Sequence, residues 1–173
     1  MLPKLTLVLG GAASGKSAWA EGLVTGTGLD RVYIATAQAF DAEMRVKIDA
    51  HRVARGPGWR TIEAPLDLTT ALADVSAGQA VLLDCATLWL SNHVLAENDL
   101  SAKSAALIKA LCACPAPVVV VSNEVGHSVV PDNALARLFQ GAQGRLNQRL
   151  AAEAGLVVQV IAGLPQVLKG AIP

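Results

Sequence analysis

The sequence predicts an α/β protein in which a mostly parallel sheet carries helices on both faces. Apolar segments typical of buried strands alternate with helical segments along the chain, an order typical of parallel strands joined by crossover helices. A glycine-rich loop at residues 10–17 stands between the first predicted strand and the first predicted helix. The length of 173 residues suffices for one domain with a substantial core, so we expect a single domain over residues 1–173.

The elements of the first half are predicted from hydrophobic pattern and from helix-ending residues. Apolar and β-branched runs too short for a helix predict strands. The first helix ends in Thr25-Gly26-Thr27-Gly28, and a second begins at Asp41, a typical N-cap, and ends at Gly56-Pro57-Gly58. In order, we expect a strand at 5–9, a helix at 15–24, a strand at 31–36, the helix from 41, an extended segment at 59–65 and a brief helix at 66–75.

The second half continues the alternation of strands and helices. The run 117–123 is continuous and β-branched, which predicts a strand buried on both faces of the sheet. Gly141 and Gly144 weaken the long amphipathic segment that contains them. In order, we expect a strand at 80–84, helices at 87–95 and 102–112, the strand at 117–123, a helix at 132–154, a final strand at 156–162 and a short tail from Gly163.

The glycine-rich loop matches the pattern G-x-x-x-x-G-K-[ST] at all of its fixed positions. Its residues are Gly10, Gly11, Ala12, Ala13, Ser14, Gly15, Lys16 and Ser17. Backbone N–H groups of such a loop surround a phosphate chain, and the N-terminus of the following helix adds partial positive charge. We expect Lys16 to reach the β- and γ-phosphates and the Ser17 hydroxyl to hold Mg²⁺. The sequence therefore predicts a nucleotide site in a P-loop NTPase-type (RecA-like) fold.

Polar residues end three other predicted strands. These residues are Thr36, Asp84 and the pair Asn123-Glu124. Ligands of parallel α/β sheets bind outside the carboxyl ends of the strands, so we expect these residues to converge with the loop. Asp84 follows four apolar residues, as in a Walker B strand, and is predicted to stand near Mg²⁺. An aspartate that only caps the next turn is the alternative at this position.

Composition excludes several classes of partner. Fourteen acidic residues balance fourteen basic ones, so no overall field favours nucleic acid or an anionic membrane. No apolar run approaches the roughly 20 residues of a membrane span, and the first strand begins too early for a signal peptide, so we expect a cytoplasmic protein. Cys85, Cys112 and Cys114 lack metal-ligand spacing and are predicted to be reduced, small apolar residues.

The residues outside the loop narrow the choice among P-loop proteins. The chain contains neither the N-K-x-D nor the D-x-x-G motif of guanine-specific switches, which argues against a regulatory GTPase. A motor ATPase needs a longer chain. A kinase of a small molecule, with in-line transfer supported by Lys16 and Mg²⁺, is the interpretation that these residues favour.

A set of collinear motifs between residue 5 and about residue 163 resembles one family. Besides the loop, the motifs are Tyr33-Ile34-Ala35-Thr36-Ala37, Asp41-x-Glu43-Met44, Ile48-x-x-His51-x-x-x-Arg55, Trp59-Arg60-Thr61-Ile62-Glu63-x-Pro65, Asp84-Cys85-x-Thr87-Leu88-Trp89-Leu90-x-Asn92, Val121-Ser122-Asn123-Glu124-Val125-Gly126, Val130-Pro131 and Gly144-Arg145-x-Asn147-Gln148. Together they resemble the bifunctional adenosylcobinamide kinase and adenosylcobinamide-phosphate guanylyltransferase, an enzyme of cobalamin biosynthesis.

The resemblance implies two reactions on a corrinoid substrate. ATP or GTP phosphorylates the aminopropanol hydroxyl of adenosylcobinamide, and GMP is then transferred from GTP through a guanylylated histidine to give adenosylcobinamide-GDP. The family's histidine falls at His51. The resemblance also implies a homotrimer, and nucleotide contacts at Ala35, Thr36, Ala37, Arg52, Val53, Ala54, Arg55, Glu63 and Asp84.

The chemistry of His51 is compatible with this role. A neutral imidazole is a competent nucleophile toward an α-phosphate once cations hold the triphosphate. Lys47 and Arg55 each lie four residues away on the predicted helix, where they suit that task and disfavour the imidazolium form. We therefore expect His51 to be largely neutral at pH 7. The other two histidines, His93 and His127, are predicted to be structural or solvated.

Two departures from the family pattern and two other functions stay open. Ala13 stands where the family commonly has Arg, which removes a possible phosphate-facing charge, and His127-Ser128 replaces an apolar-glycine pair. One alternative function is a kinase of another metabolite in which His51 never becomes covalent. The other is a non-catalytic nucleotide-sensing module.

Overall fold

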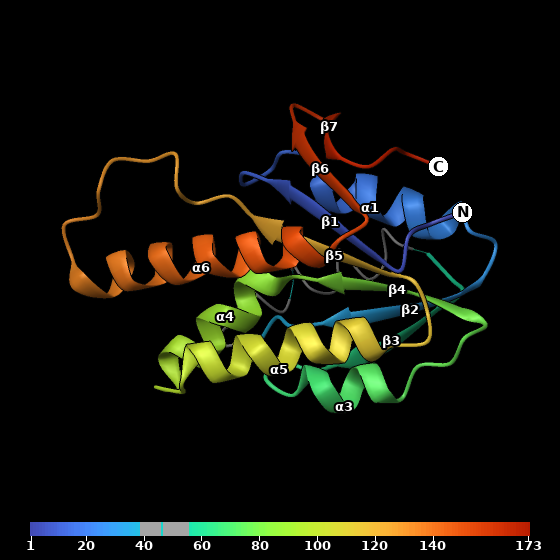
Figure 1. Cartoon of the computed structure of the whole chain (residues 1–173), viewed down its shortest axis with the longest axis horizontal. Coiled ribbons are helices and arrows are strands. Elements are labelled where there is room, and N and C mark those ends of the chain that lie inside the picture. Colours follow the sequence, from blue (N-terminus) through green and yellow to red (C-terminus); the bar gives the residue numbers. More distant parts are fainter. Residues whose placement is uncertain (39–45, 47–55) are drawn as a thin grey trace.

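Seven strands form one sheet in the order β3-β2-β4-β5-β1-β6-β7 in the structure, a computed structural model that describes residues 1–38, 46 and 56–173 (Figure 1). Every neighbouring pair of strands is parallel except β6 and β7. The strands are β1 (Leu5–Gly10), β2 (Asp30–Ala35), β3 (Trp59–Glu63), β4 (Gln79–Asp84), β5 (Val118–Asn123), β6 (Leu156–Ile161) and β7 (Leu164–Lys169). The predicted α/β class with a mostly parallel sheet is confirmed.

The described helices pack on both faces of this sheet (Figure 1). One face packs against α1, and the other against the remaining four helices. The central strands are buried on both faces, as their continuous apolar runs predict, and full burial of one Leu or Val contributes about 1.5–3 kcal/mol. The helices are α1 (Lys16–Thr25), α3 (Leu68–Ala73), α4 (Ala86–Leu95), α5 (Leu100–Ala113) and α6 (Ala134–Glu153).

The end of the chain differs from the prediction. Residues from Gly163 were expected to form a tail, whereas Leu164–Lys169 is a strand antiparallel to β6. Ala162 and Gly163 both have positive φ, 51° and 78°, which is the backbone geometry of a tight hairpin turn. Pro165 is tolerated because β7 is an edge strand, whose outer side needs no ladder hydrogen bonds. The prediction was wrong because this proline resembles the end of a strand pattern.

The other described elements agree with the sequence within a few residues. The extended segment at 59–65 is a strand of the sheet, β3, paired with β2. The glycines of α6 do not interrupt it, because its inner side is held by buried Leu146 and Leu150. The brief helix, α3, begins at Asp67, whose carboxylate accepts hydrogen bonds from the Thr70 hydroxyl and backbone N–H, which lower the pKa of Asp67. The helix predicted from Asp41 lies outside the described residues apart from Val46, which is helical.

All three cysteines are free, as predicted, although their surroundings differ. Cys85 and Cys114 are buried, whereas Cys112 is exposed on α5. Burial raises the pKa of the Cys85 thiol to about 11, with a smaller contribution from the charge of Asp84. This thiol is therefore protonated and unreactive at neutral pH.

His93 is a buried structural histidine of α4, with only 2% of its surface exposed. Its Nδ1 lies 2.8 Å from the Asn98 amide nitrogen and its Nε2 lies 3.2 Å from the carbonyl oxygen of Leu66. The amide donates to Nδ1, so the ring proton is on Nε2 and donates to Leu66. Burial lowers the pKa of His93, which keeps the ring neutral in the folded protein.

Acid should therefore destabilise the fold through His93. Below about pH 6.5 the unfolded chain takes up a proton that folded His93 resists, so the free energy of unfolding falls; above that pH both states are neutral and the contribution is constant. Thermal unfolding of the wild type and of His93→Gln between pH 7.5 and 5.5 measures this effect. We expect the difference in Tm between the two proteins to shrink toward acid, and a constant difference would contradict the assignment.

Candidate active site

The phosphate-binding loop lies where the sequence predicts it, between the end of β1 and the start of α1. A Cβ on Gly10 would meet Ser14 Oγ and would lie 2.8 Å from the carbonyl oxygen of Val160, so only glycine fits without a shift. Gly15 is the N-cap of α1 and has a φ of 89°, a left-handed conformation that favours glycine. The Lys16 ammonium donates to the Gly11 carbonyl oxygen at 3.1 Å, which keeps its charge against the loop.

The β6–β7 turn supports this loop from one side. The Gly163 N–H donates to the Ser14 carbonyl oxygen at 2.8 Å, and a Cβ on Gly15 would lie 3.1 Å from the Gly163 Cα. This contact was not predicted, because Gly163 was expected to begin a tail. A residue followed by glycine between two β-like runs is the signal that could have revealed the turn.

Two predicted carboxylates lie at the same edge of the sheet, on the strands that flank β2. Ala35 of β2 is the register partner of Glu63 on one side and of Asp84 on the other. Tyr33 and Leu82, two positions before Ala35 and Asp84, belong to the core cluster against α1, so strand alternation places the three edge residues on that same face. The small Ala35 side chain leaves space between the carboxylates. Four strand spacings of about 4.8 Å separate β1 from β3, so the row extends about 19 Å from the loop.

Thr36 fixes the neighbouring ends of β2 and β4. Its hydroxyl donates to the Cys85 carbonyl oxygen and accepts the Cys85 N–H, both at 2.8 Å. The Asn92 amide donates to the carbonyl oxygens of Thr36 and Pro65, each at 2.9 Å. Thr36 is fully buried, so its hydroxyl proton is engaged inside the protein and its side chain orients the adjacent backbone of Ala35 and Ala37.

The end of β5 is anchored to the loop and to two helices. The Glu124 N–H donates to the Gly10 carbonyl oxygen at 3.1 Å. The Asn123 N–H donates to Thr87 Oγ1 at 2.7 Å, and the Asn147 amide donates to the Asn123 carbonyl oxygen at 3.1 Å. The structure therefore brings the carboxyl ends of β1, β2, β3, β4 and β5 to one edge, as predicted.

The predicted site falls into two parts. The described part contains Gly10, Gly11, Ala12, Ala13, Ser14, Gly15, Lys16, Ser17, Ala35, Thr36, Ala37, Glu63 and Asp84, all at this edge. The other part, His51, Arg52, Val53, Ala54 and Arg55, lies outside the described residues. The role of each of these residues stays a prediction.

The oxygen donors of this edge fit a magnesium ion. Within the described residues no group of three or more His, Cys, Asp or Glu side chains could hold a metal ion. Mg²⁺ is commonly bound by one or two protein oxygens together with substrate phosphates. Ser17, in the first turn of α1, and Asp84, on the face of the sheet that α1 covers, are hard oxygen donors of that kind.

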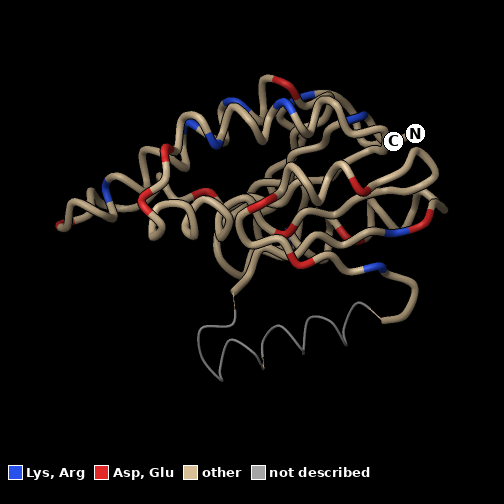
Figure 2. Tube along the Cα trace, turned by 90° about the horizontal axis from the view of Figure 1, so that it is seen from below, with Lys and Arg blue, Asp and Glu red and all other residues tan. Residues whose placement is uncertain are grey.

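Charge recognition at this site is local. Lysines, arginines and acidic residues are distributed along the described chain, and neither sign is confined to one end (Figure 2). Among the described helices, none has the length and apolar character needed to cross a membrane. The groups at this edge that are suited to phosphate are the backbone N–H groups of the loop, Lys16 and the N-terminus of α1.

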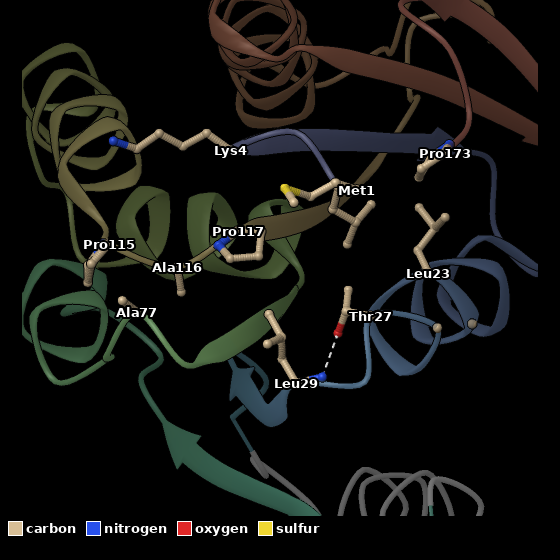
Figure 3. Close-up of a pocket in the computed structure, with 13 residues that line it drawn as sticks. Met1, Lys4, Leu23, Thr27, Leu29, Ala77, Pro115, Ala116, Pro117 and Pro173 are labelled. Carbon is tan, nitrogen blue, oxygen red and sulfur yellow. Dashed lines mark hydrogen bonds between the residues drawn. The ribbon is translucent and has the colours of Figure 1, made fainter.

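A hollow of about 940 Å³ lies at the edge of the sheet opposite to the phosphate loop (Figure 3). It lies beyond the amino ends of β1 and β5 and beside the C-terminal end of α1. Met1, Leu2, Leu23, Leu29 and Pro117 are among its mostly apolar lining residues. None of its lining residues belongs to the phosphate loop.

Comparison with known proteins identifies the family. The family model for cobinamide kinase / cobinamide phosphate guanyltransferase matches residues 6–168. The chain belongs to this family. The resemblance stated from the sequence motifs is confirmed.

Relatives in the cobinamide kinase / cobinamide phosphate guanyltransferase family match along nearly their whole length. The chain is 44% identical over 167 residues to the bifunctional adenosylcobalamin biosynthesis protein CobP of Pseudomonas aeruginosa, covering 95% of this chain and 96% of the relative. It is 41% identical over 181 residues to the bifunctional adenosylcobalamin biosynthesis protein CobU of Salmonella typhimurium, covering 95% and 99%.

A solved structure agrees on the fold of this family member. The prototypical ATPase from the type III secretion system of pathogenic bacteria superposes with a TM-score of 0.61 at 10% identity, over 96% of this chain and 57% of that one. At this identity the likeness concerns the fold alone. The predicted P-loop NTPase-type (RecA-like) fold is confirmed.

Proposed function

We propose that this protein phosphorylates adenosylcobinamide with ATP or GTP and then transfers GMP from GTP, through a guanylylated His51, to form adenosylcobinamide-GDP. The observation that carries the proposal is the complete phosphate loop beside the Glu63 and Asp84 strand ends, in a chain of the cobinamide kinase / cobinamide phosphate guanyltransferase family. The loop and the carboxylate row supply the phosphate and nucleoside ends of one elongated site.

In the kinase step the loop positions the triphosphate. Backbone N–H groups of the loop and the N-terminus of α1 face the phosphates, and Lys16 adds a full positive charge. Mg²⁺, held by Ser17 and Asp84, would supply charge neutralisation at the phosphate oxygens. The substrate hydroxyl oxygen attacks the γ-phosphorus, the bond to the bridging oxygen breaks, and the hydroxyl proton is lost.

In the second step His51 is the nucleophile toward the α-phosphorus of GTP. A ring nitrogen forms the bond to phosphorus while the bond to pyrophosphate breaks. A phosphate oxygen of adenosylcobinamide phosphate then attacks the same phosphorus and frees the imidazole. Glu63 and Asp84, on either side of Ala35, are suited to accept hydrogen bonds from guanine or ribose.

Labelling with GTP that carries its label on the α-phosphate tests the transferase half of the proposal. We expect an acid-labile, alkali-stable protein adduct in the wild type and none in His51→Ala. His127→Ala is the matched control, because His127 is exposed in a loop, and it should label like the wild type. An active kinase that forms no adduct would instead support a kinase without a covalent histidine, and a protein without any turnover would support a nucleotide-sensing module.

We also propose that the protein is cytoplasmic, as expected from the sequence, and that it forms a homotrimer, as the resemblance implies. Support for burial in an assembly comes from exposed apolar side chains at the edge strand β7 and at the end of β6. Ile161, Leu164 and Leu168 are 56%, 72% and 54% exposed, which is high for large apolar residues on one edge.

A further inference from the structure

We infer that the side-chain amide of Asn123 donates a hydrogen bond to the phosphoryl group transferred in the kinase reaction, an inference that rests on the proposed function. Asn123 is the last residue of β5, the strand between β1 and β4. Its register partner on β1 is Gly10, the first residue of the phosphate loop. The residue therefore stands beside the place where the phosphates enter the loop.

Strand alternation places the Asn123 side chain on the face that α1 covers. Gly10 and Asp84 end the two neighbouring strands. The residues two positions before each of these three strand ends all belong to the core cluster against α1, namely Val121, Val8 and Leu82. Asn123 thus lies between the start of the phosphate loop and the strand that carries the Asp84 carboxylate, on the same face as both.

Two buried side chains fix the backbone of Asn123. Thr87 Oγ1 accepts its N–H at 2.7 Å, and the Asn147 amide donates to its carbonyl oxygen at 3.1 Å. Asn147 is held in turn, because its Oδ1 accepts from Ser122 Oγ at 2.6 Å and from Gln143 Nε2 at 2.9 Å. Thr87 and Asn147 are each only 7% exposed. The position of Asn123 is therefore set before any substrate binds.

The side chain of Asn123 is available to a ligand. Both backbone groups have partners, yet the side-chain amide makes no hydrogen bond with any described residue, and the residue is half-buried. An amide nitrogen offers two hydrogen-bond donors without charge, and phosphoryl oxygens are acceptors. Lys16 would supply positive charge, whereas the Asn123 amide would supply a directional hydrogen bond. A donor fixed in advance stabilises charge on the transferred group without a cost of reorganisation during the reaction.

Two reactions measured on the same variants test this role. We would follow phosphoryl transfer from γ-labelled ATP to adenosylcobinamide and self-labelling with α-labelled GTP in Asn123→Ala and Asn123→Asp. Loss of one fixed donor should lower kcat for phosphoryl transfer about 100-fold in Asn123→Ala. Asn123→Asp should lose more, because a carboxylate repels the phosphoryl oxygens. Self-labelling should fall much less than phosphoryl transfer in Asn123→Ala, because the bond that breaks in self-labelling is at the α-phosphorus and not at the transferred γ-phosphoryl group.

Asn133→Asp is the matched control, because it makes the same chemical change at the N-cap of α6, where aspartate also caps well. It should leave both reactions unchanged.

A parallel loss of both reactions with a lowered Tm in the Asn123 variants would overturn the inference, since it would make Asn123 structural. Wild-type phosphoryl transfer in both variants would overturn it as well. A wild-type protein that cannot phosphorylate adenosylcobinamide would instead refute the proposed function, and the inference with it.

Discussion

Lys16→Ala should abolish measurable phosphoryl transfer from ATP or GTP to adenosylcobinamide. The Lys16 ammonium lies against the loop, 3.1 Å from the Gly11 carbonyl oxygen, and it is the cation that the loop motif directs to the β- and γ-phosphates. Because negative charge moves to the bridging oxygen as the γ-phosphoryl group leaves, loss of this charge should lower kcat by about 10²–10³-fold or more. Initial rates with γ-labelled ATP measure the effect.

Lys109→Ala is the control for the loss of a lysine. Lys109 is exposed on α5, which packs on the face of the sheet opposite to α1. Lys109→Ala should keep the wild-type rate of phosphoryl transfer. The Tm of Lys16→Ala should also stay close to that of the wild type, since the Lys16 ammonium makes a single hydrogen bond within the described chain. A kinase rate near normal in Lys16→Ala would contradict the assignment of the loop as the phosphoryl-transfer site.

The sequence predicts the phosphate half of the site well because its signals are local. The motif from Gly10 to Ser17 fixes the loop, the apolar run before it predicts β1, and the helical pattern after it predicts α1. Strand ends were also predictable, so Thr36, Asp84 and the pair Asn123-Glu124 were expected at one edge. Thr36 nevertheless differs from a residue whose side chain only contacts a nucleotide, because its hydroxyl hydrogen-bonds the Cys85 backbone inside the protein.

Features that depend on distant contacts could not be predicted. The sequence does not give the register that sets Ala35 between Glu63 and Asp84, because register follows from the strand order. The hydrogen bond from the Asn147 side-chain amide to the Asn123 carbonyl oxygen joins residues 24 positions apart. Neither contact has a local pattern. The hairpin at Gly163 did have a local signal, and Pro165 obscured it.

Two neighbouring glycines of the loop should differ in their response to substitution by alanine. In Gly10→Ala the new Cβ would meet Ser14 Oγ and the Val160 backbone oxygen, so the start of the loop or the end of β6 must move. Overpacking of this kind costs about 1–3 kcal/mol. We therefore expect Gly10→Ala to lower Tm by about 2–12 °C and to weaken phosphate binding, because backbone N–H groups that move no longer surround the phosphates.

Gly11→Ala provides the matched comparison, since a Cβ on Gly11 meets no protein atom within 4 Å. Its Tm should stay within about 1–2 °C of the wild type, as for other exposed substitutions without contacts. Thermal unfolding with and without ATP separates the two effects, because binding raises Tm by an amount that grows with the logarithm of the ATP concentration over Kd. Gly10→Ala should lose both intrinsic stability and the ATP-induced rise. Equal Tm values for the two variants would mean that the contact of Gly10 with Val160 does not constrain the loop, and the link between β6 and phosphate binding would then fail.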